Sequence, residues 1–452
     1  MIEQSTIAAI ATPHGTGGVS IIRVSGEDAI DICDRIFFAK SGKPLLCAKS
    51  HTLHYGWIQD KDTAVDEVLV SVMLAPHTFT GETTVEINCH GGLVVTERVL
   101  YLLLQNGATL ASPGEFTKRA FLNGKLDLSQ AEAVIDMINA PSGLALSSAA
   151  NQLGGALSFE INTLRDTVLE SLAKINANLD YPEEDMDEYE SCELLKDLEV
   201  VRDKTESLLA TAGRGKLIKD GINTVICGRP NVGKSSVLNL LARESRAIVT
   251  DIAGTTRDVI EERITINDIV LNLFDTAGIR ETEDKIESLG IDKSREYIEK
   301  AELVLFVVDG SMPLTEEDLA LYESVKNKNV MVLFNKADLG KEASLPGAEI
   351  VTLSAKTGEG LTNLSDKIEK MFRLGTISQE NTSVITNLRH KEALFSAHSA
   401  LLRALASLSS GMPHDMVSID LVECATKLGE ITGKTVSEEI VDKIFARFCL
   451  GK

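Results

Sequence analysis

The residues best suited to chemistry lie in one glycine-bracketed run near the middle of the chain. The run has the pattern Gly-x-x-x-x-Gly-Lys-Ser from Gly228 to Ser235, between a strand-type stretch at 223–227 and a helix-type stretch at 236–242. Glycines let backbone N–H groups turn inward around phosphate oxygens, and this strand–loop–helix context is the one that the pattern requires. We expect Lys234 to reach the β and γ phosphates and the Ser235 hydroxyl to ligate Mg²⁺. The residues expected to contact the nucleotide here are Asn231, Val232, Gly233, Lys234, Ser235 and Ser236.

A second run with a role at phosphates follows the strand-type stretch 269–274. It begins roughly 40 residues after the first run, and at that spacing an Asp-x-x-Gly motif is a specific signal. An aspartate at a strand end can hold magnesium through a water, and a glycine lets its backbone N–H meet the γ-phosphate. The run consists of Asp275, Thr276, Ala277 and Gly278.

Two further runs can recognise a guanine base. One follows the strand-type stretch 330–334 and the other follows 350–353. The Asp338 carboxylate can accept from both N1–H and N2–H of guanine, a donor pair that adenine lacks, so GTP is favoured over ATP. The backbone N–H of Ala355 can meet guanine O6. The two runs are Asn335, Lys336, Ala337 and Asp338, and then Ser354, Ala355 and Lys356.

The order of these motifs makes residues 217 to about 375 resemble a Ras-like GTPase domain, with one departure that bears on hydrolysis. Many such proteins place a glutamine after Asp-x-x-Gly to orient water; here the position is Ile279, which leaves a slow, binding-only GTPase open. Asn231 can instead ligate a monovalent cation near the phosphates, and Glu287 can orient water. The segment 250–258 is expected to be switch I, offering a threonine to Mg²⁺ and carbonyls to the cation.

The elements that must position these motifs change character along the chain. Up to about residue 118, alternating and helical patterns mix; beyond Pro113 only helical periodicity continues, up to a basic, glycine-punctuated boundary at 213–221. From Asn223 strands and helices alternate, which predicts a parallel sheet covered by helices, until about Phe372. Strands are expected at 7–11, 19–24, 51–58, 65–74 and 83–88, and helices at 27–38, 94–105, 117–140, 144–178, 192–212, 384–410 and 414–448.

The predicted fold is multidomain. An α+β N-terminal domain occupies 1–118, and an all-α helical domain has its first part at 119–216 and its second at 377–452. A Ras-like α/β GTPase domain with a mostly parallel sheet is inserted between these parts, at 217–376. The helices on either side of the insertion are expected to pack together, because nothing else flanks them that can bury their apolar faces.

Composition narrows the function classes. The chain has 452 residues, 44 % of them hydrophobic, and no apolar run approaches the ~18 residues of a membrane span. The N-terminus lacks the pattern of a signal peptide, so a cytoplasmic location is expected. The net charge of −22 repels nucleic acid on average, so any RNA must meet a local basic patch or be held mainly by a partner. Seven scattered cysteines predict reduced thiols.

A family resemblance covers essentially the whole chain. The runs Gly-Arg-Pro-Asn-Val-Gly-Lys-Ser, Gly-Thr-Thr-Arg-Asp and Asp-Thr-Ala-Gly-Ile-Arg resemble one group of GTPases. The flanks 80–82, 123–128 and 449–452 narrow the match, and together these motifs are similar to those of the MnmE (TrmE) family of tRNA modification GTPases. Leu450 departs conservatively from the isoleucine expected there.

The resemblance implies a function that spacing and composition do not show. It implies a potassium-activated GTPase that works as a homodimer with the flavoprotein MnmG (GidA), which carries FAD. Together they add an aminomethyl or carboxymethylaminomethyl group to C5 of the wobble uridine, position 34, of certain tRNAs. The one-carbon unit comes from 5-formyltetrahydrofolate or a related tetrahydrofolate, which the N-terminal domain binds.

The resemblance also implies residue roles. Potassium ligands are Asn231 of the phosphate loop together with Thr250, Ile252 and Thr255 of a switch segment that also includes Asp251, Ala253 and Gly254; magnesium ligands are Ser235 and Thr256. Folate contacts are Arg23, Glu82, Lys125 and Lys452, and the catalytic set is Glu287, Lys234 and Cys449. Carboxylates of a folate tail can pair with Arg and Lys, and its pterin has donor edges that a Glu can accept. The Cys449 thiol can attack C6 of uridine if its pKa is lowered; the alternative is a small buried group near a chain end.

A regulatory GTPase of ribosome assembly is the rival function. Such proteins share this type of GTPase domain, but those with tandem domains have two phosphate loops, and this chain has one. Those with a KH module carry a Gly-x-x-Gly loop in a basic C-terminal domain, whereas a helical C-terminus is expected here. A folate-binding structural subunit would leave the intact GTP motifs without a purpose.

Overall fold

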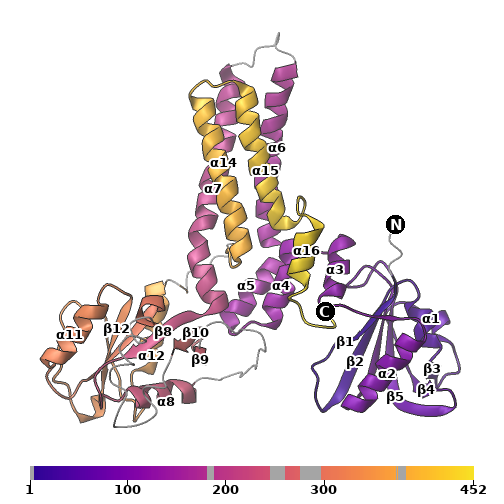
Figure 1. Ribbon diagram of the computed structural model, residues 1–452, viewed down its shortest axis with the longest axis horizontal. Helices are drawn as coiled ribbons and strands as arrows, with labels where there is room; N and C mark the ends of the chain where they lie inside the picture. The colour runs from indigo at the N-terminus through magenta and orange to yellow at the C-terminus, as the bar shows by residue number, and fades with distance from the viewer. Residues whose placement is uncertain (1–4, 181–187, 245–259, 275–296, 373, 375–382) are drawn as a thin grey trace. The chain divides into compact units, whose positions relative to one another are not determined.

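The computed structural model describes residues 5–180, 188–244, 260–274, 297–372, 374 and 383–452 (Figure 1). The chain divides into two compact units, one comprising Met1–Ile135 with Thr426–Lys452 and the other Asp136–Ala425. Over the described residues, no helix combines the length and the apolar character that a membrane crossing needs.

The first unit is built on a seven-stranded sheet of order β3-β4-β5-β6-β2-β1-β7. Every neighbouring pair is antiparallel except β1 with β7. The helices α1 and α2 pack on one face and close the core, which includes Val68, Val70 and Val72 from alternate positions of β5. The elements are β1 (Ile7–Ile10), β2 (Gly17–Ser25), α1 (Ala29–Asp34), β3 (Phe37–Ala39), β4 (Thr52–Asp60), β5 (Thr63–Met73), β6 (Thr84–Gly91), α2 (Leu93–Gln105) and β7 (Thr109–Leu110), with a 3₁₀ turn at Leu45–Cys47.

Several helix boundaries were predicted wrongly. The helices expected at 117–140, 144–178 and 414–448 are each two helices, interrupted after Leu122, Leu153 and Thr432. The helix expected at 27–38 is confined to Ala29–Asp34, and Phe37–Ala39 forms the edge strand β3. Phe37 pairs with Ile58 of β4 and is 4 % exposed, so pairing with a neighbouring strand overrides the local helical spacing.

The C-terminal end of the chain belongs to this first unit. Helices α3 (Glu115–Leu122), α4 (Leu128–Ile138) and α16 (Glu438–Phe445) share a small apolar cluster around Leu128, Phe445 and Phe448. The last residues then return to the sheet: Gly114 N donates to Cys449 O (3.3 Å), and a Cβ on Gly451 would overlap the carbonyl oxygen of Ile10. The tail therefore lies against β1, held by a close backbone approach that only glycine permits.

The second unit contains the rest of the helical bundle. Its helices are α5 (Gly143–Leu153), α6 (Ala156–Asp180), α7 (Glu188–Asp220), α14 (Leu388–Ser409) and most of α15 (His414–Thr432). The long helix α7 lies beside both α6 and α14 (Figure 1). A hydrogen bond of 2.8 Å joins Thr205 Oγ1 of α7 to His398 Nδ1 of α14. The expected packing of the helices on either side of the insertion is confirmed.

The glycines that suggested a boundary at 213–221 lie mostly inside a helix, because α7 continues to Asp220. Gly215 has a packing role: a Cβ there would overlap the carbonyl oxygen of Ile385, which lies just before α14. Gly213, half a turn earlier, faces open space. Gly221, with a positive φ of 89°, is the glycine that lies at the boundary, between the end of α7 and the start of β8 (Ile222–Cys227).

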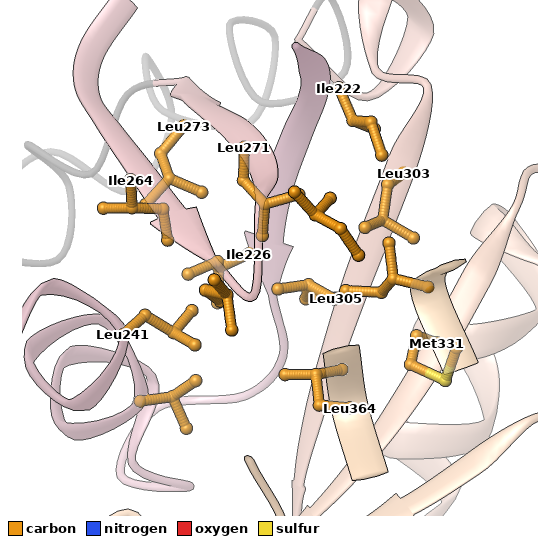
Figure 2. Close-up of a cluster of buried hydrophobic side chains, with 14 of the residues drawn as sticks. Ile222, Ile226, Leu241, Ile264, Leu271, Leu273, Leu303, Leu305, Met331 and Leu364 are labelled. Atoms are coloured by element: carbon orange, nitrogen blue, oxygen red, sulfur yellow. The ribbon is translucent and has the colours of Figure 1, made fainter. Parts of the chain in front are cut away.

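The GTPase-type part of this unit is a six-stranded sheet of order β13-β12-β11-β8-β10-β9, parallel except for β9. Its apolar core gathers side chains from strands and helices, among them Ile226, Leu241, Leu271 and Leu364 (Figure 2). The elements are β8 (Ile222–Cys227), α8 (Lys234–Glu244), β9 (Ile260–Ile266), β10 (Ile269–Phe274), β11 (Leu303–Asp309), α11 (Glu316–Val325), β12 (Val330–Asn335), a 3₁₀ turn (Ala337–Leu339), β13 (Ile350–Thr352) and α12 (Leu361–Phe372). The predicted fold class is confirmed.

The two glycines of α7 give a matched test of the packing. Gly215→Ala places a methyl group against Ile385 and is expected to lower the free energy of unfolding by about 1–3 kcal/mol, although alanine is the better helix former. Gly213→Ala has open space and is expected to raise it by about 0.5–1 kcal/mol. Calorimetric unfolding of the full chain measures both; a stabilised Gly215→Ala variant would contradict the packing argument.

Candidate functional site

The phosphate loop between β8 and α8 has a shape that side chains would prevent. Gly228 (φ 145°) and Gly233 (φ 97°) both have positive φ. A Cβ on Gly228 would overlap the Val307 carbonyl oxygen of β11, and one on Gly233 would overlap the Asn335 side-chain amide. Asn231, at φ 64°, adds a left-handed turn between them. The loop thus passes close to two neighbouring strand ends, as a backbone cradle for phosphate requires.

Lys234 closes over this loop from the first turn of α8. Its Nζ donates to the carbonyl oxygens of Gly228 and Arg229, each at 2.8 Å. Burial lowers the pKa of Lys234, with a smaller opposing influence from Cys227. A phosphate anion held by the loop would favour the charged ammonium, so the lysine is placed to gain from binding one.

An ion pair fixes the outer edge of the loop. Arg229 Nε donates to Asp318 Oδ1 at 2.6 Å, and Asp318 also closes the capping box of α11 with Thr315. Burial alone would raise the pKa of Asp318, but hydrogen bonds from Arg229 and Thr315 outweigh it and the net direction is down. Sequence reasoning missed this pair, although the Thr315–Asp318 spacing is a readable helix-start signal.

The predicted base-reading runs meet around Asn335. This residue is 2 % exposed; its Nδ2 donates to Val232 O of the phosphate loop at 2.9 Å, and its Oδ1 accepts from Ala355 N at 3.0 Å. Ser354 Oγ donates to Asp338 Oδ1 at 2.8 Å and orients the carboxylate that is expected to read guanine. The backbone N–H of Ala355, which was assigned to guanine O6, thus already donates to a side-chain oxygen.

Lys336 ties the same corner to β11. It has a left-handed backbone (φ 62°), and its Nζ donates to Asn231 O at 3.1 Å and to Asp309 Oδ2 at 2.6 Å. Burial raises the pKa of Asp309, but hydrogen bonds from Lys336 and Ser311 pull it below its ordinary value. Asp309 was not singled out from the sequence; its place at the end of a buried strand, beside the phosphate loop, is the signal that would have found it. Ser236 and Lys356 are exposed.

The remaining nucleotide-site predictions lie outside the described residues. They are Thr250, Asp251, Ile252, Ala253, Gly254, Thr255 and Thr256 of the expected switch I, Asp275, Thr276, Ala277 and Gly278 of the second phosphate run, Ile279, and Glu287.

The residues assigned to folate lie in the first unit. Arg23 of β2 donates through Nε to Glu86 Oε1 (2.8 Å) and through Nη1 to Gly451 O (3.2 Å), and its guanidinium lies 5.6 Å from the centre of the Phe116 ring. The C-terminal tail and Arg23, more than 400 residues apart in sequence, therefore meet at one place on the sheet.

Glu82 is held by a partner that the sequence did not suggest. Arg119 of α3, 5 % exposed, donates from Nη1 to Glu82 Oε2 at 3.2 Å, and Ser25 Oγ donates to the same oxygen at 2.7 Å. A carboxylate has about four acceptor positions, so Glu82 retains capacity for a ligand's N–H groups. An arginine on the apolar face of a short helix, next to Phe116 and Ala120, is the signal that could have found this contact.

Lys125 and Lys452 lie against the loop that precedes Glu82. Lys125 Nζ donates to Pro76 O at 3.1 Å, and Lys452 Nζ lies 5.9 Å from the centre of the Phe79 ring. Burial and the charge of Arg23 lower the pKa of Lys452 against the opposing influence of Glu86. A cationic, partly desolvated surface next to an aromatic ring suits a ligand that carries both a ring and carboxylates. Cys449 is exposed, so the buried alternative for this thiol was wrong.

The fold and these loops define a class: a P-loop protein of the Ras-like type. Comparison with known families narrows it. The MnmE helical domain model matches residues 128–449, and the model of the GTP-binding protein TrmE N-terminus matches 6–125. The chain belongs to the MnmE family of tRNA modification GTPases. It therefore binds GTP and hydrolyses it.

Individual relatives agree with the family models. The tRNA modification GTPase MnmE of Geobacillus thermodenitrificans is 50 % identical over 462 residues, covering 100 % of both chains. That of Bacillus subtilis is 47 % identical over 459 residues, covering 99 % of this chain and 100 % of its own. Among solved structures, the FeoB G-domain of Methanococcus jannaschii is 27 % identical, covers 34 % of this chain and 98 % of its own, and has a TM-score of 0.25.

The guanine corner yields a quantitative expectation. Asp338→Asn removes the carboxylate that accepts two guanine N–H groups; with about 1.5–3 kcal/mol per charged hydrogen bond, GTP affinity should fall at least about tenfold. The affinity for xanthosine triphosphate, which offers an acceptor at C2, should fall less in this variant. Ser354→Ala keeps the carboxylate and loses only its orienting bond, so it should weaken GTP slightly and retain base preference. Titration of both variants with fluorescent nucleotides tests this, and unaltered GTP affinity in Asp338→Asn would exclude the assignment.

Proposed function

We propose that this chain is a potassium-activated GTPase that drives modification of the wobble uridine, position 34, of certain tRNAs together with a flavoprotein of the MnmG (GidA) kind, which carries the FAD. The product is an aminomethyl or carboxymethylaminomethyl group at C5, built from a 5-formyltetrahydrofolate-type one-carbon unit. We assign folate binding and dimerisation to 1–118, the GTPase to 217–376, and the helical scaffold to 119–216 and 377–452, with Cys449 at its end.

The observation that supports this function most is the meeting of the C-terminal tail with Arg23. A chain that needed only to bind and hydrolyse GTP would have no reason to bring an exposed cysteine and a partly desolvated lysine to a sheet outside the GTPase part. The cluster offers Arg23, Lys125 and Lys452 to carboxylates and Glu82 to donor groups of a pterin. Folate, when bound, would supply the one-carbon unit, and these side chains would bind and orient it.

The phosphate loop supports a second cation besides magnesium. Asn231 is exposed at the left-handed turn of the loop, and its carbonyl already accepts from Lys336, so its side chain projects from a fixed backbone. Asn231 with Thr250, Ile252 and Thr255 is the proposed potassium set, and Ser235 with Thr256 the magnesium set. Oxygen and carbonyl ligands of this kind suit such cations, and a monovalent charge at the β,γ bridge would stabilise the transition state.

An exposed apolar surface on β4 and β5 of the first sheet supports the homodimer. From Leu53 to Trp57 of β4 and from Glu67 to Met73 of β5, the odd-numbered residues point away from the core, and Tyr55 pairs with Leu69 on that face. Leu53, Tyr55 and Leu69 are 59 %, 39 % and 42 % exposed, a set of apolar side chains that a second copy of the chain can cover. The side chain of Arg23, paired with Glu86, also points away from the core. The proposed interface and the proposed folate site therefore lie on the same face of the sheet.

Hydrolysis should depend on the identity of the monovalent cation. We expect GTP turnover at least about tenfold faster in K⁺ than in Na⁺ at equal ionic strength, because a correctly sized cation replaces an arginine-type charge in the transition state. Phosphate release under saturating GTP and Mg²⁺ measures it, and Asn231→Ala should remove the K⁺ advantage. Equal rates in both salts would rule out the cation role.

A second prediction concerns the residue proposed to orient water. The Glu287→Ala variant should bind GTP and hydrolyse it poorly.

The cellular role is tested by nucleoside analysis of tRNA. Mass spectrometry of a strain that lacks this chain should show position-34 uridines without the aminomethyl-type groups, and the wild-type chain should restore them. Unchanged nucleosides in the deletion strain would instead favour the regulatory GTPase of ribosome assembly.

The same assay tests the Cys449 thiol. Complementation with Cys449→Ser should fail if the thiol attacks uridine C6; normal modification by that variant would remove the nucleophile role.

A further inference from the structure

The hairpin of β9 and β10 ends in a strained two-residue turn. Ile266 pairs directly with Ile269, so Asn267 and Asp268 form the whole connection. Their φ angles are positive, 45° and 65°. Tight hairpins of this kind favour glycine at the second turn position, because an L side chain is disfavoured in the left-handed region. An aspartate at this position calls for a compensating contact.

The compensating contact is with the helical part of the same unit. Asp268 Oδ1 accepts from the backbone N of Gly143, the first residue of α5, at 3.2 Å. The helix already has an N-cap, since the Ser142 side chain accepts from Ala145 N; Asp268 satisfies a different orphan donor. A Cβ on Gly143 would stand 3.1 Å from both carboxylate oxygens of Asp268, so the absence of a side chain at Gly143 makes this approach possible.

A second link joins the middle of the hairpin to the end of α7. Arg263 Nη2 of β9 and Asn272 Nδ2 of β10 both donate to the carbonyl oxygen of Asp220, at 2.8 and 2.9 Å. Arg263 Nε also donates to Asn272 Oδ1 at 3.0 Å, which couples the two strands across the pair. The last carbonyl of α7 is therefore capped by side chains from both strands of the hairpin.

The apolar contacts follow the same route. Ala145 of α5 and Ile218 of α7 belong to the buried cluster that contains Ile264 and Ile269 of the hairpin. Beside them is a cavity of about 180 Å³, whose lining includes Arg263, Ala149 and the Lys219–Asp136 ion pair. The hairpin is thus bound to α5 and α7 by polar contacts at two points, with the cavity beside them.

Both ends of the hairpin adjoin segments that are predicted to contact the nucleotide. β9 begins at Ile260, just after the predicted switch segment 250–258, and β10 ends at Phe274, directly before Asp275. We propose that the β9–β10 hairpin carries the nucleotide state from the phosphate site to the helical part, and that Asp268 is the positioning residue that connects it to α5. The inference rests on the proposed function in one respect, the assignment of 250–258 and 275–278 as the segments that sense the γ-phosphate.

Hydrogen–deuterium exchange on the full-length protein tests this. With a non-hydrolysable GTP analogue and with GDP, amides in the first turn of α5 should exchange at rates that differ at least about fivefold, the lower end of usual coupling factors. Asp268→Gly suits the positive φ and keeps the hairpin, so nucleotide affinity and GTP turnover should stay within about twofold of wild type, while the difference at α5 is lost. The matched control is Asn267→Gly, which removes the bond from Asn267 Nδ2 to Ser365 Oγ of α12 (2.8 Å) but leaves the Asp268 contact intact, and it should retain the difference.

The outcomes separate this inference from the proposed function, because the experiment needs neither tRNA, folate nor the partner. Exchange within 260–274 is the internal check. A hairpin that responds to the nucleotide while α5 does not, or an Asp268→Gly variant that keeps the α5 response, overturns the inference alone. A protein in which neither the hairpin nor α5 responds overturns the inference together with the proposed sensing segments. A wild-type response with unchanged wobble nucleosides would instead contradict the proposed function and leave the inference standing.

Discussion

The buried side chain of Asn335 is the interaction on which the nucleotide site depends. One amide group bonds to the phosphate loop through Val232 and to the run after β13 through Ala355. It therefore sets the spacing between the loop assigned to phosphates and the corner assigned to the base. With Asn335 only 2 % exposed, breaking either bond would leave a polar group unsatisfied in a low-dielectric region, so the spacing is strongly enforced.

Two ion pairs beside this site hold its loops to neighbouring elements. Two carboxylates neutralise the cationic side chains near the phosphate loop. Asp318 pairs with Arg229, and Asp309 pairs with Lys336. Both pairs connect a loop at the carboxyl edge of the parallel sheet to a neighbouring element, α11 in one case and β11 in the other. The edge is where a parallel sheet brings separate loops together, and the pairs hold those loops in the arrangement that a nucleotide needs.

The two candidate sites lie in different compact units of the chain, and this separation defines the mechanistic problem of the protein. The phosphate loop lies beside β8, whereas the Arg23 cluster lies on the first sheet with the C-terminal tail. Under the proposed function, the nucleotide state has to be carried first through secondary-structure elements of the GTPase unit itself. The hydrogen-bonded hairpin of β9 and β10, anchored to α5 and α7, is suited to the first step because paired strands move as a body.

The sequence alone determined the phosphate loop, the guanine-reading runs, the fold class and the family, because each rests on residues that are contiguous or regularly spaced. Local pattern also located most strands and helices, and it failed at Phe37–Ala39 and at Gly213–Asp220, where a strand partner or a neighbouring backbone decides the outcome. Tertiary structure alone disclosed the partners of the site residues: Arg119 for Glu82, Asp309 for Lys336, the tail for Arg23 and α5 for Asp268. Those contacts join positions tens to hundreds of residues apart, and no periodicity in the sequence records which distant side chain the folded backbone will bring within hydrogen-bonding distance.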